Sequence, residues 1–127
     1  MIIKIDGGSR NNPGKSACAM VIDDNYSTAI GKYLGIKTNN EAEYYGLLLA
    51  LVYINKNNIN NCTILSDSML IVNQFNSKWM FHKKELSVLC HKCWDLSNKK
   101  IIKLSYIPRE QNYLADKKVN EVLDNNK

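Results

Sequence analysis

The stretch Met1-Ile2-Ile3-Lys4-Ile5-Asp6-Gly7-Gly8-Ser9 indicates a strand that stops at a carboxylate and passes into a glycine-rich turn. Its residues are mostly apolar up to Asp6, and turn-forming residues then dominate positions 7–14. The chain repeats the arrangement at Cys62-Thr63-Ile64-Leu65-Ser66, an apolar run that stops at Asp67. We expect the two runs to be neighbouring strands at the centre of one sheet, with a carboxylate at the end of each.

Strand-like runs and helical spacings of apolar residues follow one another along the chain. We expect strands at 1–6, 17–22, 28–37, 62–66 and 100–108, and helices at 42–54, 69–75, 84–97 and 112–123. Short links between the first three strands favour antiparallel hairpins, whereas helical crossovers allow the last two strands to lie parallel. The sequence therefore predicts an α/β fold, with a mixed five-stranded sheet and helices on both faces.

The segment Thr38-Asn39-Asn40-Glu41 predicts the start of the first helix, because polar capping residues precede an apolar periodic run. That run is apolar on more than one side, which is typical of a buried helix. The chain shows no internal repeat or linker, so we expect a single domain over 1–127, with the last few residues frayed.

The 127 residues carry a formal net charge of +5 at pH 7, and their mean hydropathy of -0.32 is that of a soluble protein. The basic surplus favours a polyanionic partner, although a general solubility charge explains it equally well by itself. No apolar stretch approaches the about 20 residues of a membrane helix, and the first residues lack the layout of a signal peptide. We therefore expect a cytoplasmic monomer without membrane contact.

The four cysteines form no pattern typical of a disulfide-linked secreted domain. Cys90 and Cys93 have the spacing of half a zinc site, but both fall in a helical pattern. Cys18 and Cys62 lie inside strand-like runs. We interpret all four as buried free thiols.

Four acidic residues occupy positions that suit a metal site, namely Asp6, Glu43, Asp67 and Asp116. Brought together, they would repel one another and lose solvation, a penalty that a divalent cation removes. Oxygen ligands without His or Cys favour Mg²⁺ or Mn²⁺ over zinc. Two such ions about 3.5–4 Å apart, bridged by Asp6, would suit phosphodiester hydrolysis without a protein nucleophile.

Four segments together resemble the ribonuclease H type 1 family, and the resemblance covers nearly the whole chain. They are Asp6-Gly7-Gly8-Ser9 with Asn12-Pro13-Gly14, Thr38-Asn39-Asn40-Glu41-Ala42-Glu43, Ser66-Asp67-Ser68, and Pro108-Arg109-Glu110-Gln111-Asn112 followed by Ala115-Asp116. The resemblance implies endonucleolytic cleavage of the RNA strand of RNA–DNA hybrids, leaving 5′ phosphate and 3′ hydroxyl ends. The four acidic residues match the family's metal-binding and catalytic positions.

The resemblance also implies contacts with the hybrid. Asn12, Asn39 and Asn40 are similar to residues that contact its minor groove, where 2′-hydroxyls and base edges are exposed. Thr38 is similar to part of a pocket for a DNA phosphate. Trp79 is similar to an aromatic residue that packs on a DNA sugar, with a buried residue at a helix end as the equal alternative.

The chain departs from the family in the residue after Ser68 and in a basic helix. Many members have Gln at the position of Met69, so one hydrogen bond to a base edge is expected to be missing. A basic handle helix found in some members has no room within 79–86, and we expect a compact protein without it. His82, Lys83 and Lys84 are explained equally well in two ways. They partly replace the charge of the handle helix, or they form a solvated run on the surface.

A third departure is that the loop 107–112 contains no His, whereas several members have a mobile His before the fourth acid. Arg109 is the residue in this loop that we expect to steer a substrate phosphate.

Two other functions remain open from the sequence. One is a module that binds hybrids without cutting them, although such a module gains nothing from clustered carboxylates. The other is a related nuclease that acts on double-stranded RNA or structured DNA, which the fold by itself does not exclude.

Overall fold

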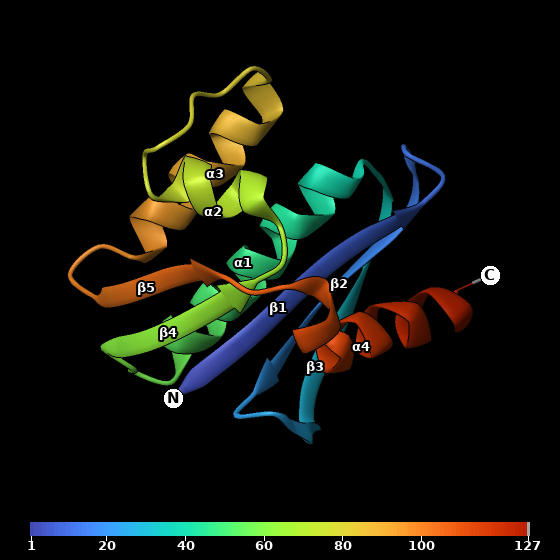
Figure 1. Ribbon diagram of the computed structural model, residues 1–127, viewed down its shortest axis with the longest axis horizontal. Helices are drawn as coiled ribbons and strands as arrows, with labels where there is room; N and C mark the ends of the chain where they lie inside the picture. The colour runs from blue at the N-terminus through green and yellow to red at the C-terminus, as the bar shows by residue number, and fades with distance from the viewer. Residues whose placement is uncertain (127) are drawn as a thin grey trace.

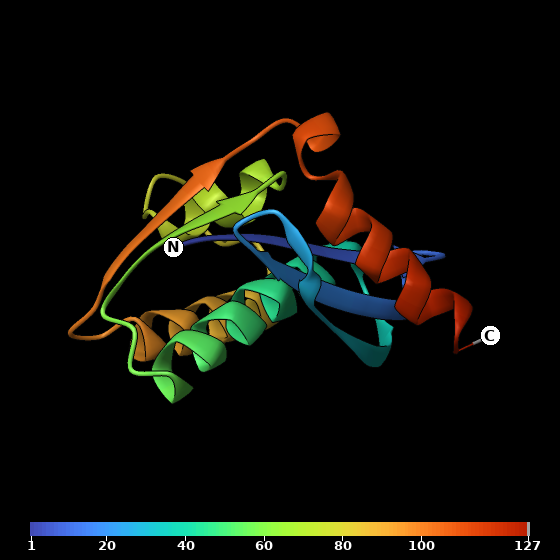
Figure 2. The same ribbon diagram turned by 90° about the horizontal axis from the view of Figure 1, so that it is seen from below.

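The computed structural model describes residues 1–126, and five strands of this part form one mixed sheet with helices on both faces (Figures 1 and 2). The elements are β1 (Ile2–Arg10), β2 (Gly14–Ile22), β3 (Asn25–Lys37), α1 (Asn39–Lys56), β4 (Asn61–Ser66), α2 (Met69–Phe75), α3 (Lys84–Leu96), β5 (Ile101–Tyr106), a 3-10 turn (Arg109–Gln111) and α4 (Tyr113–Asp124). The strand order is β3-β2-β1-β4-β5. The first three strands are antiparallel, and β4 and β5 continue in parallel from β1. The predicted fold class is confirmed.

Strand β1 continues past Asp6, so the prediction that Asp6 ends this strand is wrong. Parallel pairing between β1 and β4 stops at Ile5 opposite Ser66. Antiparallel pairing between β1 and β2 continues to Arg10 opposite Lys15. Asp6 therefore lies in the middle of β1, at the point where β4 ends and one edge of β1 becomes open.

The two faces of the sheet are covered by different helices. Helix α1 packs on β1 and β2, and α3 packs beside α1 on the same side of the sheet (Figure 2). Helix α4 packs on the opposite face, against β2, β3 and β1 (Figure 2). The larger core lies under α1 and includes Ile3, Ile5 and Leu47, whereas Ala17 and Val119 belong to a smaller cluster under α4.

Helix α1 begins as the sequence predicts. Thr38 is the N-cap, with its hydroxyl accepting from the Glu41 amide, while the Glu41 side chain accepts from the Thr38 amide. This reciprocal capping box satisfies two backbone donors that a helix start leaves unpaired. It fixes the first turn of α1, directly before Glu43.

The remaining boundaries lie within a few residues of the predicted ones. Between α2 and α3, residues 76–83 form no helix, in agreement with the predicted absence of a handle. Helix α4 extends to Asp124, and of the tail that was predicted to fray, Lys127 lies outside the described residues. The four cysteines are buried and free, as predicted. No helix within 1–126 is both long and apolar enough to cross a membrane.

Candidate active site

A cavity of about 450 Å³ opens where the end of β4, the middle of β1 and the first turns of α1 and α4 meet. All four predicted carboxylates line it: Asp6, Glu43, Asp67 and Asp116. Asn39 and Arg109 also contribute to its wall. The structure thus gathers residues from four separate stretches of the chain into one pocket.

Three of the four carboxylates converge closely. Asp6, Glu43 and Asp67 each place one oxygen atom within 4.8 Å of the other two. Asp116 lies in the first turn of α4 and lines the same cavity without joining this close group. The structure therefore contains a compact triad with a fourth carboxylate beside it.

Two glycines allow α1 to bring Glu43 to Asp6. Gly7, in β1, lies against the backbone of α1, and Gly46, in α1, lies against the backbone of Asp6. A Cβ atom built on Gly46 would come within 2.8 Å of the Asp6 carbonyl oxygen. The helix and strand approach more closely here than two residues with side chains would permit.

Burial makes this cluster electrostatically strained. The pKa of Asp6 is raised from 3.8 to about 8, first because its carboxyl is buried and then because Asp67 and Asp116 add negative charge. The pKa of Glu43 is also raised well above its usual value, by burial and then by the charges of Asp6 and Asp67. The two side chains also influence each other directly: Glu43 lowers the pKa of Asp6, and Asp6 raises the pKa of Glu43.

The donor atoms fit a hard divalent cation. Glu43 Oε1 is buried, and no hydrogen-bond donor within residues 1–126 reaches it. An unpaired buried carboxylate oxygen is unfavourable unless a positive charge satisfies it. The triad offers carboxylate oxygens only, which are the ligands that Mg²⁺ and Mn²⁺ prefer.

Sequence reasoning missed the role of Asn112, although it quoted this residue within the closing motif. Asn112 is completely buried, and its Nδ2 donates to the Ile5 carbonyl at 2.8 Å and to Asp67 Oδ2 at 3.2 Å. The signal in the sequence was a polar residue one turn before Asp116, at the start of an amphipathic helix. Only the folded chain shows that its side chain points into the sheet.

Two of the predicted hybrid-binding asparagines are ordered by the backbone around the cavity. Asn39 Oδ1 accepts from the Ser9 amide at 2.8 Å, and Asn12 Oδ1 accepts from the Asn39 amide at 3.0 Å. Both carbonyl oxygens are thus engaged, and both side chains are exposed, so each Nδ2 group remains available as a donor. Asn40 is exposed in the first turn of α1.

The other predicted binding residues lie in different settings. The Thr38 hydroxyl takes part in the capping box of α1. Trp79 follows α2 and is 47% exposed, so the alternative of a buried helix-end residue is wrong. It does not line the carboxylate cavity, whereas Arg109 does. Met69 is 52% exposed at the first position of α2.

Comparison with known proteins agrees with this architecture. A family model described as reverse transcriptase-like matches residues 4–122. The fold is similar to that of RNase H1 from the halophilic archaeon Halobacterium salinarum, with a TM-score of 0.87, 28% identity and coverage of 98% of this chain and 97% of that one. It is also similar to LC11-RNase H1 in complex with an RNA/DNA hybrid, with a TM-score of 0.86, 31% identity and coverage of 94% of each chain. The chain belongs to the ribonuclease H type 1 family.

A longer relative contains the same ribonuclease H unit. The bifunctional protein Rv2228c of Mycobacterium tuberculosis is 32% identical over 98% of this chain. This chain spans about a third, 35%, of the length of that protein. The solved N-terminal RNase H domain of Rv2228c gives a TM-score of 0.88 at 32% identity, covering 97% of this chain and 92% of that one. The similarity is therefore to the ribonuclease H domain of the longer protein.

Proposed function

We propose that this chain is a metal-dependent endoribonuclease that hydrolyses the RNA strand of RNA–DNA hybrids. The observation that carries the proposal is the triad of Asp6, Glu43 and Asp67, whose oxygens lie within 4.8 Å of one another beside an unpaired buried oxygen of Glu43. A protein that only binds nucleic acid gains nothing from negative charge that faces phosphates. Family membership and the hybrid bound to LC11-RNase H1 favour this substrate for the chain.

Asp6, Glu43 and Asp67 would hold one cation, and Asp116 together with Asp6 would help to hold a second. Bound Mg²⁺ or Mn²⁺ would activate a water molecule as the nucleophile and neutralise charge on the leaving 3′ oxygen, which gives 5′ phosphate and 3′ hydroxyl products. The contribution of the chain is to fix four carboxylates on rigid elements. Asp6 lies within a paired strand, and Glu43 lies in a capped helix.

We infer the contacts with the substrate from the side-chain donors near the cavity. The Nδ2 groups of Asn12 and Asn39 would donate to acceptors in the minor groove of the hybrid, with Asn40 beside them. Arg109, in the cavity wall, would contact a phosphate of the RNA strand. Thr38 would contribute to a DNA phosphate site, and the exposed ring of Trp79 would pack on a DNA sugar.

The test is incubation of labelled RNA–DNA hybrid, double-stranded RNA and double-stranded DNA with Mg²⁺, Mn²⁺ or EDTA. We expect cleavage of the RNA strand of the hybrid, dependence on the metal, and loss of cleavage with Asp67→Asn. Tight binding of the hybrid without cleavage would support a non-cutting module instead. Cleavage of double-stranded RNA or DNA in preference to the hybrid would support a related nuclease.

We also propose a location in the cell and an oligomeric state. Because RNA–DNA hybrids arise inside cells, we propose a cytoplasmic enzyme, and the closed carboxylate site requires only one copy of the chain. Size-exclusion chromatography with light scattering tests the monomer.

A further inference from the structure

We propose that Asn112 is a positioning residue that holds Asp67 and the start of α4 in the geometry needed for cation binding. The inference rests on the proposed function, because it concerns the same carboxylate site. Asn112 itself does not contact the substrate or offer a ligand atom. It acts through the carboxylates that it orients.

The location of Asn112 follows from the way the sheet divides. The parallel pairing of β1 and β4 ends at Ile5 opposite Ser66, and the two strands separate beyond it. The side chain of Asn112 enters this gap and donates to the Ile5 carbonyl oxygen at 2.8 Å. The Asn112 amide thus takes the place of the backbone N–H that a longer β4 would supply. It satisfies the Ile5 carbonyl, which would otherwise be buried and unpaired.

The same amide nitrogen holds Asp67. Asn112 Nδ2 also donates to Asp67 Oδ2, and the two atoms are 3.2 Å apart. Within residues 1–126, Asn112 is the side chain that donates to Asp67 in this structure. A neutral donor on one carboxylate oxygen orients the group without cancelling its charge, and it leaves the other oxygen for the shared site.

The partners of Asn112 also fix which way its amide faces. Ile5 O and Asp67 Oδ2 are both acceptors, so the nitrogen must face them. The other end of the amide, Oδ1, is buried and receives no donor from the described residues. An unpaired buried acceptor costs free energy, and its presence indicates that the two Nδ2 bonds are what this position requires.

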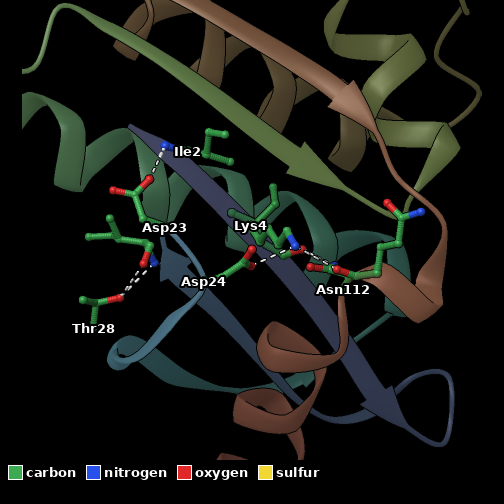
Figure 3. Close-up of polar contacts among 9 residues, drawn as sticks. Ile2, Lys4, Asp23, Asp24, Thr28 and Asn112 are labelled. Carbon is green, nitrogen blue, oxygen red and sulfur yellow. Dashed lines mark hydrogen bonds and ion pairs between the residues drawn. The ribbon is translucent and has the colours of Figure 1, made fainter.

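The backbone of Asn112 connects the same point to the fourth carboxylate. The Asp116 amide donates to the Asn112 carbonyl at 3.2 Å, in the first turn of α4. The preceding carbonyl, that of Gln111, accepts from Lys4 Nζ at 3.0 Å, and Lys4 also pairs with Asp24 at 2.8 Å (Figure 3). Successive residues of this loop are therefore anchored to successive residues of β1. Asn112 links β1, Asp67 and Asp116 in one network.

The experiment compares Asn112→Ser with Asn112→Ala in the whole chain. The two variants leave nearly the same cavity and differ by one hydroxyl donor, so they separate positioning from packing. Mn²⁺ affinity is measured by calorimetry and by the rise in melting temperature with Mn²⁺, without substrate. We expect Asn112→Ala to weaken Mn²⁺ binding by about 10-fold or more, and Asn112→Ser to recover part of that loss.

Lys4→Ala is the matched control, because it removes the neighbouring anchor of the loop without touching Asp67. It should lower the melting temperature and leave the Mn²⁺ dissociation constant unchanged. Asn112 variants that lose stability but bind Mn²⁺ like the native chain would overturn the inference. Equal Mn²⁺ binding by the Ser and Ala variants would overturn it as well.

The inference and the proposed function fail in different ways. Native protein that binds Mn²⁺ but leaves the hybrid intact overturns the proposed function, while the Asn112 series still measures positioning. Native protein that cleaves the hybrid, with Asn112 variants of native Mn²⁺ affinity, overturns the inference alone. Native protein without any Mn²⁺ binding overturns both.

Discussion

Gly7 lies so close to the backbone of Ala42 that a Cβ atom built on Gly7 would come within 2.2 Å of the Ala42 carbonyl carbon and oxygen. This contact brings α1 onto β1 at the position of the carboxylate cluster. The Gly7 backbone amide also lowers the pKa of Asp6 and of Glu43, which partly offsets the effect of burial. A residue without a side chain thus decides how near the two carboxylates come.

Replacing Gly7 by Ala should force α1 away from β1. We expect a loss of about 3 kcal/mol or more in unfolding free energy, since the new atom meets backbone that cannot rotate away. Urea denaturation measures the free energy of unfolding of both proteins. Gly8→Ala is the control in the same strand, where a Cβ atom would meet Val119 Cγ1 at an ordinary 3.6 Å. Equal stability of the two variants would contradict the close packing described for Gly7.

Asp6→Asn should abolish hybrid cleavage and raise the stability of the metal-free protein. At a pH above about 8, where Asp6 is ionised, the substitution removes a buried charge that Asp67 and Asp116 repel. We expect an increase of roughly 1 kcal/mol or more in unfolding free energy in EDTA. Asp95→Asn on the exposed surface of α3 is the control, with a change within about 0.5 kcal/mol. A melting temperature that falls for Asp6→Asn would argue against clustered acids.

The stability of the metal-free protein should decrease as the pH rises. The pKa of Asp6 is raised from 3.8 to about 8 and that of Glu43 is also raised, so the folded protein binds more protons than the unfolded chain between these values. Their contribution is therefore complete below the unfolded pKa and is lost as the pH rises through the folded one. Melting temperatures in EDTA from about pH 5 to pH 9 measure the trend.

Asp6→Asn provides the control for this pH dependence, because it should flatten the curve. Stabilisation by Mg²⁺ should grow with pH, since cations compete with protons for the same oxygens. A native melting temperature that climbs across this range in EDTA would show that the buried carboxylates do not hold extra protons.

Thr38→Ala should separate helix capping from substrate binding. Loss of the hydroxyl removes the N-cap bond to the Glu41 amide, so we expect about 1 kcal/mol less stability. Thr38→Ser keeps the hydroxyl and should retain the native value. Affinity for the hybrid, measured with Ca²⁺ to prevent turnover, should follow the same order if Thr38 also serves a phosphate. Native affinity in the Ala variant would limit Thr38 to capping.

Arg109→Ala should weaken the binding of the hybrid, because Arg109 is the cation of the 107–112 loop in the wall of the carboxylate cavity. We expect a higher KM and a slope of log affinity against log salt that is smaller by about 1. Arg109→Lys keeps the charge and should retain most of the slope. Lys99→Ala, on the exposed turn before β5, should leave KM unchanged. An unaltered salt slope in Arg109→Ala would remove this residue from the phosphate contacts.

Local signals in the sequence were sufficient for the elements and for the chemical type of the site. Thr38 and Glu41 predict a capped helix because their side chains act on their own backbone. The apolar run before Asp67 predicts the end of a strand. The structure agrees, because β4 has no pairing beyond Ser66. The end of β1 was predicted wrongly because it depends on β2, whose pairing carries the strand through Gly7 and Gly8.

The sequence by itself determined the order of strands and helices, the oxygen-only character of the ligands and the family to which they belong. These properties depend on periodicity and on side-chain chemistry, which each segment carries alone. The tertiary structure decided that Asp6, Glu43 and Asp67 converge within 4.8 Å while Asp116 lies beside them. It also decided that Asn112 bonds to Ile5, 107 positions earlier in the chain. Such contacts arise from the packing of separate elements, so no single segment can encode them.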